Sequence, residues 1–317
     1  MCTKRFGVIG GGMIGASIAC LFAGNGFAVT LIEQSAFVEK AKENCGFIFS
    51  DLVAHDIISE DQAQIIKSYL HISDNYQDLS DVEFVFECVF ERTDVKHAVY
   101  RELEAVCHDL KAIASSTSAI SADDLIKGFT KPEFAKLLVV AHPWNPPHLA
   151  PCIEIAKSTC VDENAVCFVK DLMESVGKDV VVLLKDIPGF IGNRLQYAML
   201  REAIHIVEQG AATPEMIDRT LKYSFAPRYT EIGIFEHFDN CGQDLVSQIS
   251  DYLFADLCNE KATQKSVADN CAQGNLGVKT GKGMLDWDGI DIAQFRSRAA
   301  KPYYRFCHWN FPSKPNK

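Results

Sequence analysis

Short apolar runs alternate with amphipathic stretches over residues 1–186. The runs are rich in Val, Ile, Phe and Leu, with little polar alternation, and lie at Arg5–Ile9, Phe27–Glu33, Val82–Cys88, Ala112–Ser116, Leu137–His142 and Val180–Leu184. Helix-like stretches lie between them, at Met13–Ala23, Thr93–Val106 and Asn164–Ser175. Strands of a parallel sheet that is covered on both faces have this apolar pattern. We therefore predict an α/β domain over residues 1–186, built on a doubly wound sheet.

Residues 37–70 depart from the alternation and form a helical insertion. Their pattern is that of two long helices joined by a turn at residues 58–60, which predicts a helical hairpin projecting from the sheet. The hairpin is acidic, because residues 39–67 contain three lysines against six carboxylates: Lys40, Lys42, Lys67, Glu39, Glu43, Asp51, Asp56, Glu60 and Asp61. A polyanionic ligand would gain little from such a surface.

The pattern becomes helical after residue 186. A strongly periodic stretch begins at Phe190 and ends at Gly210, and Thr213 then serves as the N-cap of a further helix. No strand-like run follows. We predict an all-α C-terminal domain over residues 187–317, with a frayed polar tail at residues 312–317.

An uncharged segment near the start of the chain raises the question of a membrane anchor. Residues 6–32 carry no charge and follow Lys4 and Arg5, as in a signal peptide. Seven glycines and Asn25 interrupt the segment, however, and Glu33 closes it at a strand end. We expect no membrane segment and a cytoplasmic protein.

Composition excludes several classes of protein. The 317 residues include 31 Lys and Arg against 42 Asp and Glu, and no stretch concentrates the basic residues. A general nucleic-acid binder or an anionic-membrane binder is therefore not expected. The twelve cysteines form no C-x-x-C pair and fall mostly in apolar runs, which indicates free thiols in a reducing compartment. Without an H-E-x-x-H motif or a carboxylate cluster at ligand spacing, we expect no metal site.

A glycine-rich motif joins the first predicted strand to the first helix. Gly10–Gly15 reads G-x-G-x-x-G, and the next strand ends at Glu33, 18 residues beyond Gly15. In a Rossmann-type fold these positions serve the tight turn, the approach to a pyrophosphate and close helix–strand packing. A carboxylate at Glu33 would bind a ribose diol and repel a 2′-phosphate, which favours NAD over NADP; the alternative is a glycine turn without a ligand. The predicted cofactor contacts here are Gly10, Gly12, Met13, Ile14, Gly15 and Glu33.

A histidine and a glutamate are the candidates for acid–base chemistry. His142 ends a buried-looking strand, where sheet enzymes of this class place reactive groups. Its neutral imidazole could take a proton from a substrate hydroxyl as hydride leaves for a nicotinamide. Glu154, twelve residues on in another apolar run, could hold the second ring nitrogen. The other eight histidines have no comparable setting.

Two further motifs carry polar groups suited to a substrate or cofactor. Residues 114–118 (ASSTS) place small hydroxyl side chains at a strand end, where they could meet a nicotinamide ribose or a substrate oxygen, or simply cap the next helix. Asn193, in the segment 189–195, could point its amide at a substrate carbonyl or make a helix-start hydrogen bond.

Taken in chain order, these motifs resemble the L-3-hydroxyacyl-CoA dehydrogenase family along essentially the whole chain. The matching segments are the glycine-rich loop, ECVFERTDVK at 87–96, ASSTS at 114–118, the His142–Glu154 pair, DIPGFIGNRL at 186–195 and GVKTGKGMLDW at 277–287. The resemblance implies an NAD-binding domain followed by a helical domain that dimerises and closes the active site. It also implies the reversible oxidation of an L-3-hydroxy group to 3-oxo with NAD, as in fatty acid metabolism.

The resemblance also implies a role for individual residues. His142 matches the general base and Glu154 its orienting partner, while Ser118 and Asn193 match the side chains that bind the substrate oxygen. Further positions are expected at the cofactor (Glu91, Lys96 and Ser116, the last where the family often has Asn) and at the substrate (Asn145 and Arg228).

Within the family, three segments favour one branch. AHPWNPP (141–147), NRLQYAMLREA (193–203) and PRYTEIGIFE (227–236) are closer to lambda-crystallin, an L-gulonate 3-dehydrogenase, and to carnitine dehydrogenases. Those relatives oxidise free 3-hydroxy acids, and Arg228 could pair with a free carboxylate or be a surface residue. The acidic hairpin would face the CoA nucleotide in acyl-CoA enzymes. The thioester and the free acid both remain open as substrates.

Other classes of protein fit less well. A short-chain reductase would need a Tyr-x-x-x-Lys pair after the serine cluster, a 6-phosphogluconate-type enzyme is a lesser rival, and a repressor would need a basic helix-turn-helix. A crystallin-like structural protein would have no need of Ser118, His142, Glu154 and Asn193 together. We therefore expect an enzyme.

Overall fold

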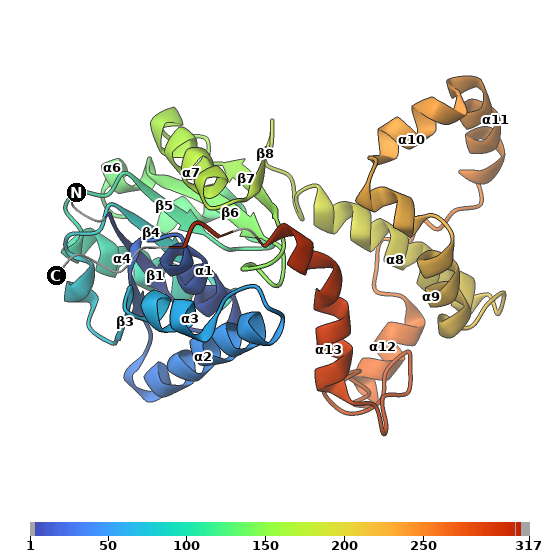
Figure 1. Cartoon of the computed structure of the whole chain (residues 1–317). Helices are drawn as coiled ribbons and strands as arrows, with labels where there is room; N and C mark the ends of the chain where they lie inside the picture. Colours follow the sequence, from blue (N-terminus) through green and yellow to red (C-terminus); the bar gives the residue numbers. More distant parts are fainter. Residues whose placement is uncertain (1–3, 308, 312–317) are drawn as a thin grey trace. The chain divides into compact units, whose positions relative to one another are not determined.

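The structure is a computed structural model that describes residues 4–307 and 309–311. The chain forms two compact units. Unit 1 contains residues up to 191 together with the segment from 297 onward, and unit 2 contains residues 192–296. Figure 1 traces both units along the chain. The tail expected to fray, residues 312–317, lies outside the described residues.

Unit 1 is built on one eight-stranded sheet, in the order β3-β2-β1-β4-β5-β6-β7-β8. The strands are β1 Arg5–Ile9, β2 Ala28–Ile32, β3 Leu70–Ser73, β4 Phe84–Glu87, β5 Ala112–Ser115, β6 Leu138–Pro143, β7 Cys152–Lys157 and β8 Asp179–Val182. The first six run parallel, whereas β7 is antiparallel to β6 and parallel to β8. The strand order reverses beside β1, which is where Rossmann-type sheets bind dinucleotides. The predicted doubly wound sheet is confirmed.

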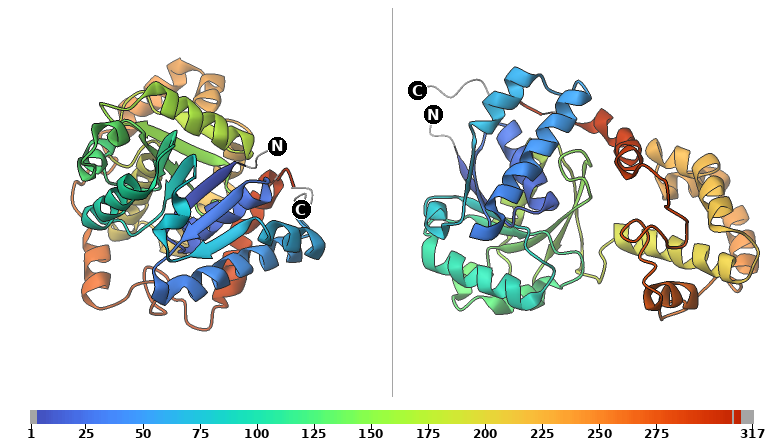
Figure 2. Two further views of the ribbon diagram at one scale, coloured as in Figure 1. Left: turned by 90° about the vertical axis from the view of Figure 1, so that its left-hand side faces the viewer. Right: turned by 90° about the horizontal axis from the view of Figure 1, so that it is seen from below.

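Helices cover both faces of this sheet, as the two views in Figure 2 make clear. They are α1 Met13–Gly24, α2 Val38–Ala54, α3 Glu60–Lys67, α4 Thr93–Val106, α5 Ala122–Leu125, α6 Pro132–Ala135 and α7 Glu163–Ser175. Alternate residues of a strand enter separate cores: Phe84 and Phe86 pack with α1, α2 and α7, while Val85 packs with α4. The buried strands therefore carry apolar residues on both faces, which is why they read as unbroken apolar runs.

The structure corrects two expectations for unit 1. β3 and β7 were not predicted: β3 is only four residues long and partly exposed, and the charged Glu154 interrupts the apolar run of β7. The predicted helical insertion is present as α2 and α3, but its packing and the length of its second helix differ from the expectation. α2 lies against α1 with its apolar face in the core, and α3 has only eight residues, begun by a capping box at Ser59.

Unit 2 is helical, which confirms the predicted class of the C-terminal domain. Its helices are α8 Gly192–Glu208, α9 Pro214–Tyr223, α10 Ile234–Cys241, α11 Gln243–Leu253 and α12 Lys265–Ala272, and α13 Ile292–Ala300 leads out of it. Gly210 follows α8 at φ +72°, a conformation that favours glycine. Thr213 caps α9 by accepting a hydrogen bond from the Met216 N–H, as its sequence position predicts.

The end of the chain returns to unit 1, whereas we expected all of residues 187–317 to form the helical domain. The Tyr304 hydroxyl donates to Asp51 Oδ2 at 2.7 Å, and its ring stacks on His55 with centroids 4.1 Å apart. Trp309 lies so close over Gly24 of α1 that a Cβ at Gly24 would be 2.2 Å from the ring. Burial of these aromatic side chains fastens the segment to unit 1.

Three general properties of the described part of the chain bear on its class. In residues 4–307 and 309–311, no helix combines the length and the apolar composition that crossing a membrane requires. The eleven cysteines of this part are all free. It also contains no group of three or more His, Cys, Asp and Glu side chains that could hold a metal ion.

Candidate active site

The predicted site residues of unit 1 gather at one edge of the sheet. Ile9 pairs with Glu87, Glu87 with Ser115, and Ser115 with Val140. Because these strands are parallel, the segments that follow them meet at their carboxyl ends, where α/β enzymes bind ligands. His142, two residues beyond Val140, lies at the same edge.

The glycine-rich loop has the geometry of a pyrophosphate cradle. Gly10 has φ +97°, and a Cβ there would lie 2.7 Å from the Cys88 carbonyl oxygen. A Cβ at Gly15 would lie 1.8 Å from the Gly10 carbonyl oxygen, so the helix–strand approach requires glycine. A Cβ at Gly12 would meet no atom within 4 Å, which leaves open space in front of the N-terminus of α1 at Met13. These three properties fit a dinucleotide phosphate.

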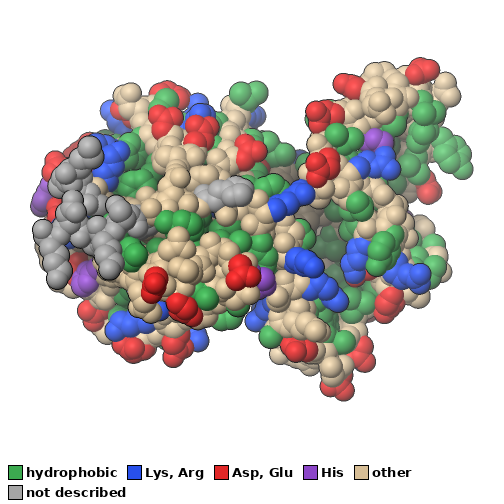
Figure 3. Space-filling view, viewed as in Figure 1, with side chains coloured by type: hydrophobic (Ala, Val, Ile, Leu, Met, Phe, Trp, Pro, Cys, Tyr) green, Lys and Arg blue, Asp and Glu red, His purple; other side chains and the backbone are tan. Residues whose placement is uncertain are grey.

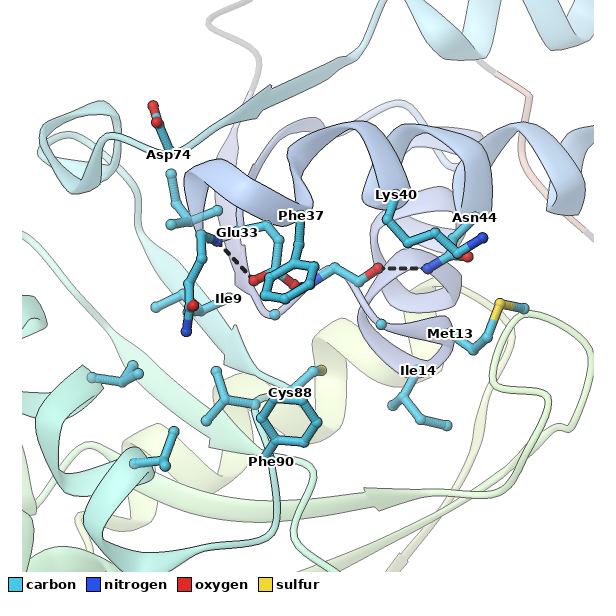
Figure 4. Close-up of a pocket in the computed structure, with 18 of the residues that line it drawn as sticks. Ile9, Met13, Ile14, Glu33, Phe37, Lys40, Asn44, Asp74, Cys88 and Phe90 are labelled. Carbon is cyan, nitrogen blue, oxygen red and sulfur yellow. Dashed lines mark hydrogen bonds between the residues drawn. The ribbon is translucent and has the colours of Figure 1, made fainter. Parts of the chain in front are cut away.

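Beside this loop lies a pocket of about 680 Å³ that can take the adenosine half of a dinucleotide. Its lining includes Glu33, Phe37 and Phe90, and Figure 4 shows Phe37 next to Glu33, with Met13 and Ile14 together to one side. Glu33 accepts hydrogen bonds from the Gly11 N–H and the Gln34 N–H, each at 2.7 Å. Asn44 donates to the Gly11 carbonyl oxygen at 2.9 Å and ties α2 to the loop. The carboxylate is thus held beside the cradle, where a ribose diol would lie.

Glu91 organises the segment that follows β5. Its Oε1 accepts from the Thr117 hydroxyl at 2.6 Å and from the Ser118 and Ala119 N–H groups at 2.9 Å each. Partial burial acts to raise the pKa of Glu91, but the hydrogen bond from Thr117 and the nearby Lys96 ammonium outweigh it and lower the pKa. Glu91 is therefore an anion that fixes the backbone at Ser118.

Lys96 lies behind Glu91 and has no exposed side-chain surface. Its Nζ is 2.8 Å from Glu87 Oε1 and 3.6 Å from Glu91 Oε2. Glu87, fully buried, also accepts from the hydroxyls of Tyr100 at 3.0 Å and Ser115 at 2.7 Å. Lys96 therefore acts on this edge of the sheet only through Glu91, whose negative charge it stabilises. Glu87 was not among the predicted site residues, although a carboxylate in an apolar strand, nine residues before a lysine, was a readable signal.

Ser116 and Ser118 occupy different settings in this segment. The Ser116 N–H continues the sheet by donating to the Glu87 carbonyl oxygen at 2.9 Å, and the residue is half-buried next to Cys88. Ser118 is exposed, with its backbone held by Glu91. Of the two hydroxyls, that of Ser118 is the more accessible to a ligand.

His142 and Glu154 stand directly opposite each other on the antiparallel strands β6 and β7. Their side chains are 7% and 3% exposed, and His142 Nδ1 lies 3.5 Å from Glu154 Oε2. The other carboxylate oxygen accepts from the Ile191 N–H at 2.8 Å. Phe190 covers the imidazole, with ring centroids 5.2 Å apart. A fixed carboxylate on one ring nitrogen leaves the other, Nε2, as the atom that could exchange a proton with a ligand.

Three other predicted residues belong to elements other than β6 and β7. Asn145 is exposed on the loop after β6. Asn193, the second residue of α8, and Arg228 both belong to unit 2. Arg228 Nη1 lies 3.0 Å and 3.2 Å from the two ring nitrogens of His237.

The sheet order, the glycine cradle and the acidic residue at the end of β2 define a nicotinamide-dependent dehydrogenase. Two family descriptions match the chain in succession: "3-hydroxyacyl-CoA dehydrogenase, NAD binding domain" over residues 5–187 and "3-hydroxyacyl-CoA dehydrogenase, C-terminal domain" over residues 189–287. The chain belongs to the 3-hydroxyacyl-CoA dehydrogenase family. It is an NAD-dependent oxidoreductase of the kind that acts on CH–OH groups.

The chain is similar to several named proteins, and the names of the dehydrogenases among them denote different substrates. It is 30% identical over 284 residues to 5-formyl-3-hydroxy-2-methylpyridine 4-carboxylate 5-dehydrogenase of Mesorhizobium japonicum, covering 89% of this chain and 90% of that one. A solved structure of that dehydrogenase, described as an NAD⁺-dependent dismutase, matches with a TM-score of 0.86 and 28% identity over 96% and 97% of the two chains. L-carnitine dehydrogenase of Oceanobacillus iheyensis is 32% identical over 75% and 76%. Lambda-crystallin of Oryctolagus cuniculus is 29% identical over 77% of each chain. These matches include the predicted branch.

Proposed function

We propose that this protein reversibly oxidises the 3-hydroxy group of a small free carboxylic acid to 3-oxo, with His142 as general base. The observation that carries the proposal is the buried His142–Glu154 pair at the carboxyl edge of the sheet. The carboxylate is anchored by the Ile191 N–H and therefore keeps its orientation toward the ring. Such a pair can accept a proton and stabilise the resulting imidazolium.

In this mechanism, His142 Nε2 takes the hydroxyl proton while Glu154 faces Nδ1. When bound, NAD accepts the hydride from the carbon that carried the hydroxyl. Ser118 and Asn193 hold the substrate oxygen, and Phe190 shields the imidazole from water. In the reverse direction His142 returns the proton to that oxygen, so the same residues serve ketone reduction.

The cofactor residues follow from the pocket. The N–H groups at the start of α1 bind the pyrophosphate, and Gly10, Gly12, Met13, Ile14 and Gly15 line that contact. Glu33 binds the adenosine ribose and excludes a 2′-phosphate. Glu91, with Lys96 behind it, and Ser116 shape the nicotinamide side. Residues 1–186 serve as the NAD-binding domain and residues 187–317 as the substrate and dimerisation domain.

Surface charge supports a free acid over a CoA thioester. On α2, Lys40 pairs with Glu43 at 2.9 Å and Lys42 pairs with Glu39 at 2.7 Å, so a CoA phosphate at this surface would meet a carboxylate beside each ammonium. The names of two relatives, a carnitine and a pyridine carboxylate dehydrogenase, denote substrates that carry a free carboxylate. In this chain Arg228, with Asn145, would bind that group.

The family description keeps a 3-hydroxyacyl-CoA as the second candidate substrate, and that substrate would place the protein in fatty acid metabolism.

We also propose a cytoplasmic homodimer formed through unit 2. The free cysteines agree with a reducing compartment. Large apolar side chains remain exposed on α10 and α11, among them Phe235 at 83% and Tyr252 at 86%. Figure 3 shows hydrophobic side chains at the surface of this region. Burial of such a patch against a second copy would stabilise a dimer.

The test is a panel of substrates with purified protein. NADH oxidation is followed with acetoacetyl-CoA, and NAD reduction with L-gulonate, L-carnitine and 3-hydroxybutyrate. Turnover of a free acid in preference to the thioester supports the proposal, and Arg228→Met should then raise KM for that acid. Efficient turnover of acetoacetyl-CoA alone would assign the protein to the thioester instead.

A further inference from the structure

Residues 144–151 form the loop between β6 and β7. It joins the strand of His142 to the strand of Glu154 without regular secondary structure. Inside the loop, the N–H groups of Leu149 and Ala150 both donate to the Pro146 carbonyl oxygen, at 3.0 Å and 2.8 Å. These bonds close one bend, and the other carbonyl groups of the loop must find partners elsewhere.

A buried lysine supplies two of those partners. Lys178, the residue before β8, is only 9% exposed. Its Nζ donates to the carbonyl oxygens of Pro147 at 2.5 Å and Ala150 at 2.8 Å. Within residues 4–307 and 309–311, its ammonium forms no ion pair with a carboxylate. Burial lowers the pKa of Lys178 to about 8.

A buried cation without a carboxylate partner is unfavourable, since burial costs it hydration. An apolar side chain of the same length would pack without that cost, but it would leave the carbonyls of Pro147 and Ala150 without a donor. Compared with an apolar side chain, Lys178 therefore costs desolvation free energy, but it supplies the donors that define the conformation of the loop.

Two other elements hold the same loop. His148 Nδ1 shares a hydrogen bond with the Ser17 hydroxyl of α1 at 3.0 Å, and both side chains are buried. The Cys307 thiol, from the returning end of the chain, lies 3.8 Å from the His148 carbonyl oxygen. The loop is thus tied to the helix that presents the glycine cradle, and Lys178 holds it from the side of β8.

We propose that Lys178 is a positioning residue for catalysis, which holds the loop of residues 144–151 so that His142 and Glu154 keep their productive geometry. The inference rests on the proposed function, because it assigns the loop to the catalytic pair. Lys178 makes no contact with substrate or cofactor in this account. Its effect is on turnover, whereas NADH binding depends on the glycine cradle across α1.

The test compares Lys178→Met, which removes the donors, with Lys178→Gln, which keeps two N–H donors without the charge. Val106→Ala serves as the control for lost stability, because Val106 is buried at the far end of α4 in the other core. Three quantities are measured for each variant: kcat with the best substrate of the panel, the NADH dissociation constant by fluorescence, and amide hydrogen exchange of residues 144–151.

We expect Lys178→Met to lower kcat by about tenfold to a hundredfold, as misplaced catalytic groups do. Its NADH dissociation constant should stay within about twofold of the wild type, and Leu149 and Ala150 should exchange faster. Lys178→Gln should recover part of kcat, and Val106→Ala should keep kcat.

Unchanged exchange in the loop, or a kcat no lower than that of Val106→Ala, would overturn the proposal. A parallel loss of NADH affinity would also overturn it, because the effect would then be general damage to unit 1. If the wild type turns over no substrate of the panel, the proposed function fails, and the exchange comparison still decides whether Lys178 holds the loop.

Discussion

At the scale of single residues, the proposed function separates groups that exchange protons or bind ligands from groups that hold those groups in place. His142 and Glu154 face each other and are almost fully buried, and Glu33 lines the pocket beside the glycine-rich loop. Glu87 and Lys178 carry buried charges. Glu87 pairs with Lys96, and Lys178 donates hydrogen bonds to backbone carbonyls of the loop at residues 144–151. Substitutions in the first group should change chemistry or cofactor choice, whereas substitutions in the second should change geometry and stability.

Glu154→Gln should lower kcat by about tenfold or more, because the imidazolium that forms on His142 loses its counter-charge. The acid limb of the pH–rate profile for alcohol oxidation should move to lower pH for the same reason. The Gln side chain has nearly the same shape and can still accept the Ile191 N–H bond, so folding should be retained. An unaltered rate and profile would show that Glu154 does not support the base.

Glu33→Ala should reduce the preference for NAD over NADP by about tenfold, equivalent to about 1.4 kcal/mol. The carboxylate would no longer bind the ribose diol or repel a 2′-phosphate. Steady-state kcat/KM for both cofactors measures the preference. Glu39→Ala is the matched control, since it removes the same charge from an exposed position on α2. Equal effects of both variants would contradict a direct role for Glu33.

His148 should make stability depend on pH between about 6.5 and 4. Burial, assisted by the Lys178 charge, lowers the pKa of His148 to about 4. Below pH 6.5 the unfolded chain therefore binds a proton that the folded chain rejects, and stability falls as pH falls, by about 3 kcal/mol in total. Urea unfolding at pH 7 and pH 4.5 should show a smaller loss for His148→Gln than for the wild type. Equal losses would refute this linkage.

At the scale of elements, the sequence predicted most of the sheet, because its central strands are unbroken apolar runs. β7 was not predicted because Glu154 interrupts its apolar pattern. In the fold this carboxylate is buried, where it faces His142 and accepts a hydrogen bond from the Ile191 N–H. The length of the α2–α3 insertion was correct, but its packing against α1 depends on tertiary contacts that periodicity does not specify. For the candidate site, the sequence paired His142 with Glu154, and the structure places the two on facing strands. Glu87 was a readable signal that we did not use, and Lys178 gave no signal in the sequence.

Trp309→Ala should destabilise unit 1 by about 3 kcal/mol, because it removes a large buried aromatic and opens a cavity over Gly24. Denaturant unfolding followed by circular dichroism measures the loss. Phe311→Ala, at a position 37% exposed, is the control and should have a much smaller effect. A Trp309→Ala protein as stable as the control would mean that the end of the chain does not contribute to the fold of unit 1.

At the scale of the whole molecule, the chain forms two compact units. Unit 1 contains the glycine-rich loop, the His142–Glu154 pair and the returning segment around Trp309, and unit 2 contains Asn193, Arg228 and an exposed apolar surface. We predicted the passage between the two near residue 187, because the apolar runs give way there to helical periodicity, and in the structure unit 2 begins at Gly192. It did not reveal the return of the chain to unit 1, since a few aromatic residues near a terminus show no periodicity.

The central claim is that His142 is the general base of an NAD-dependent hydroxyl oxidation. The most direct measurement is kcat of His142→Ala beside its NADH dissociation constant, with the substrate that the wild type uses best. The account predicts a kcat lower by about 10²- to 10⁴-fold with NADH binding unchanged. A variant that retains wild-type turnover would contradict it and would require another base at this edge of the sheet.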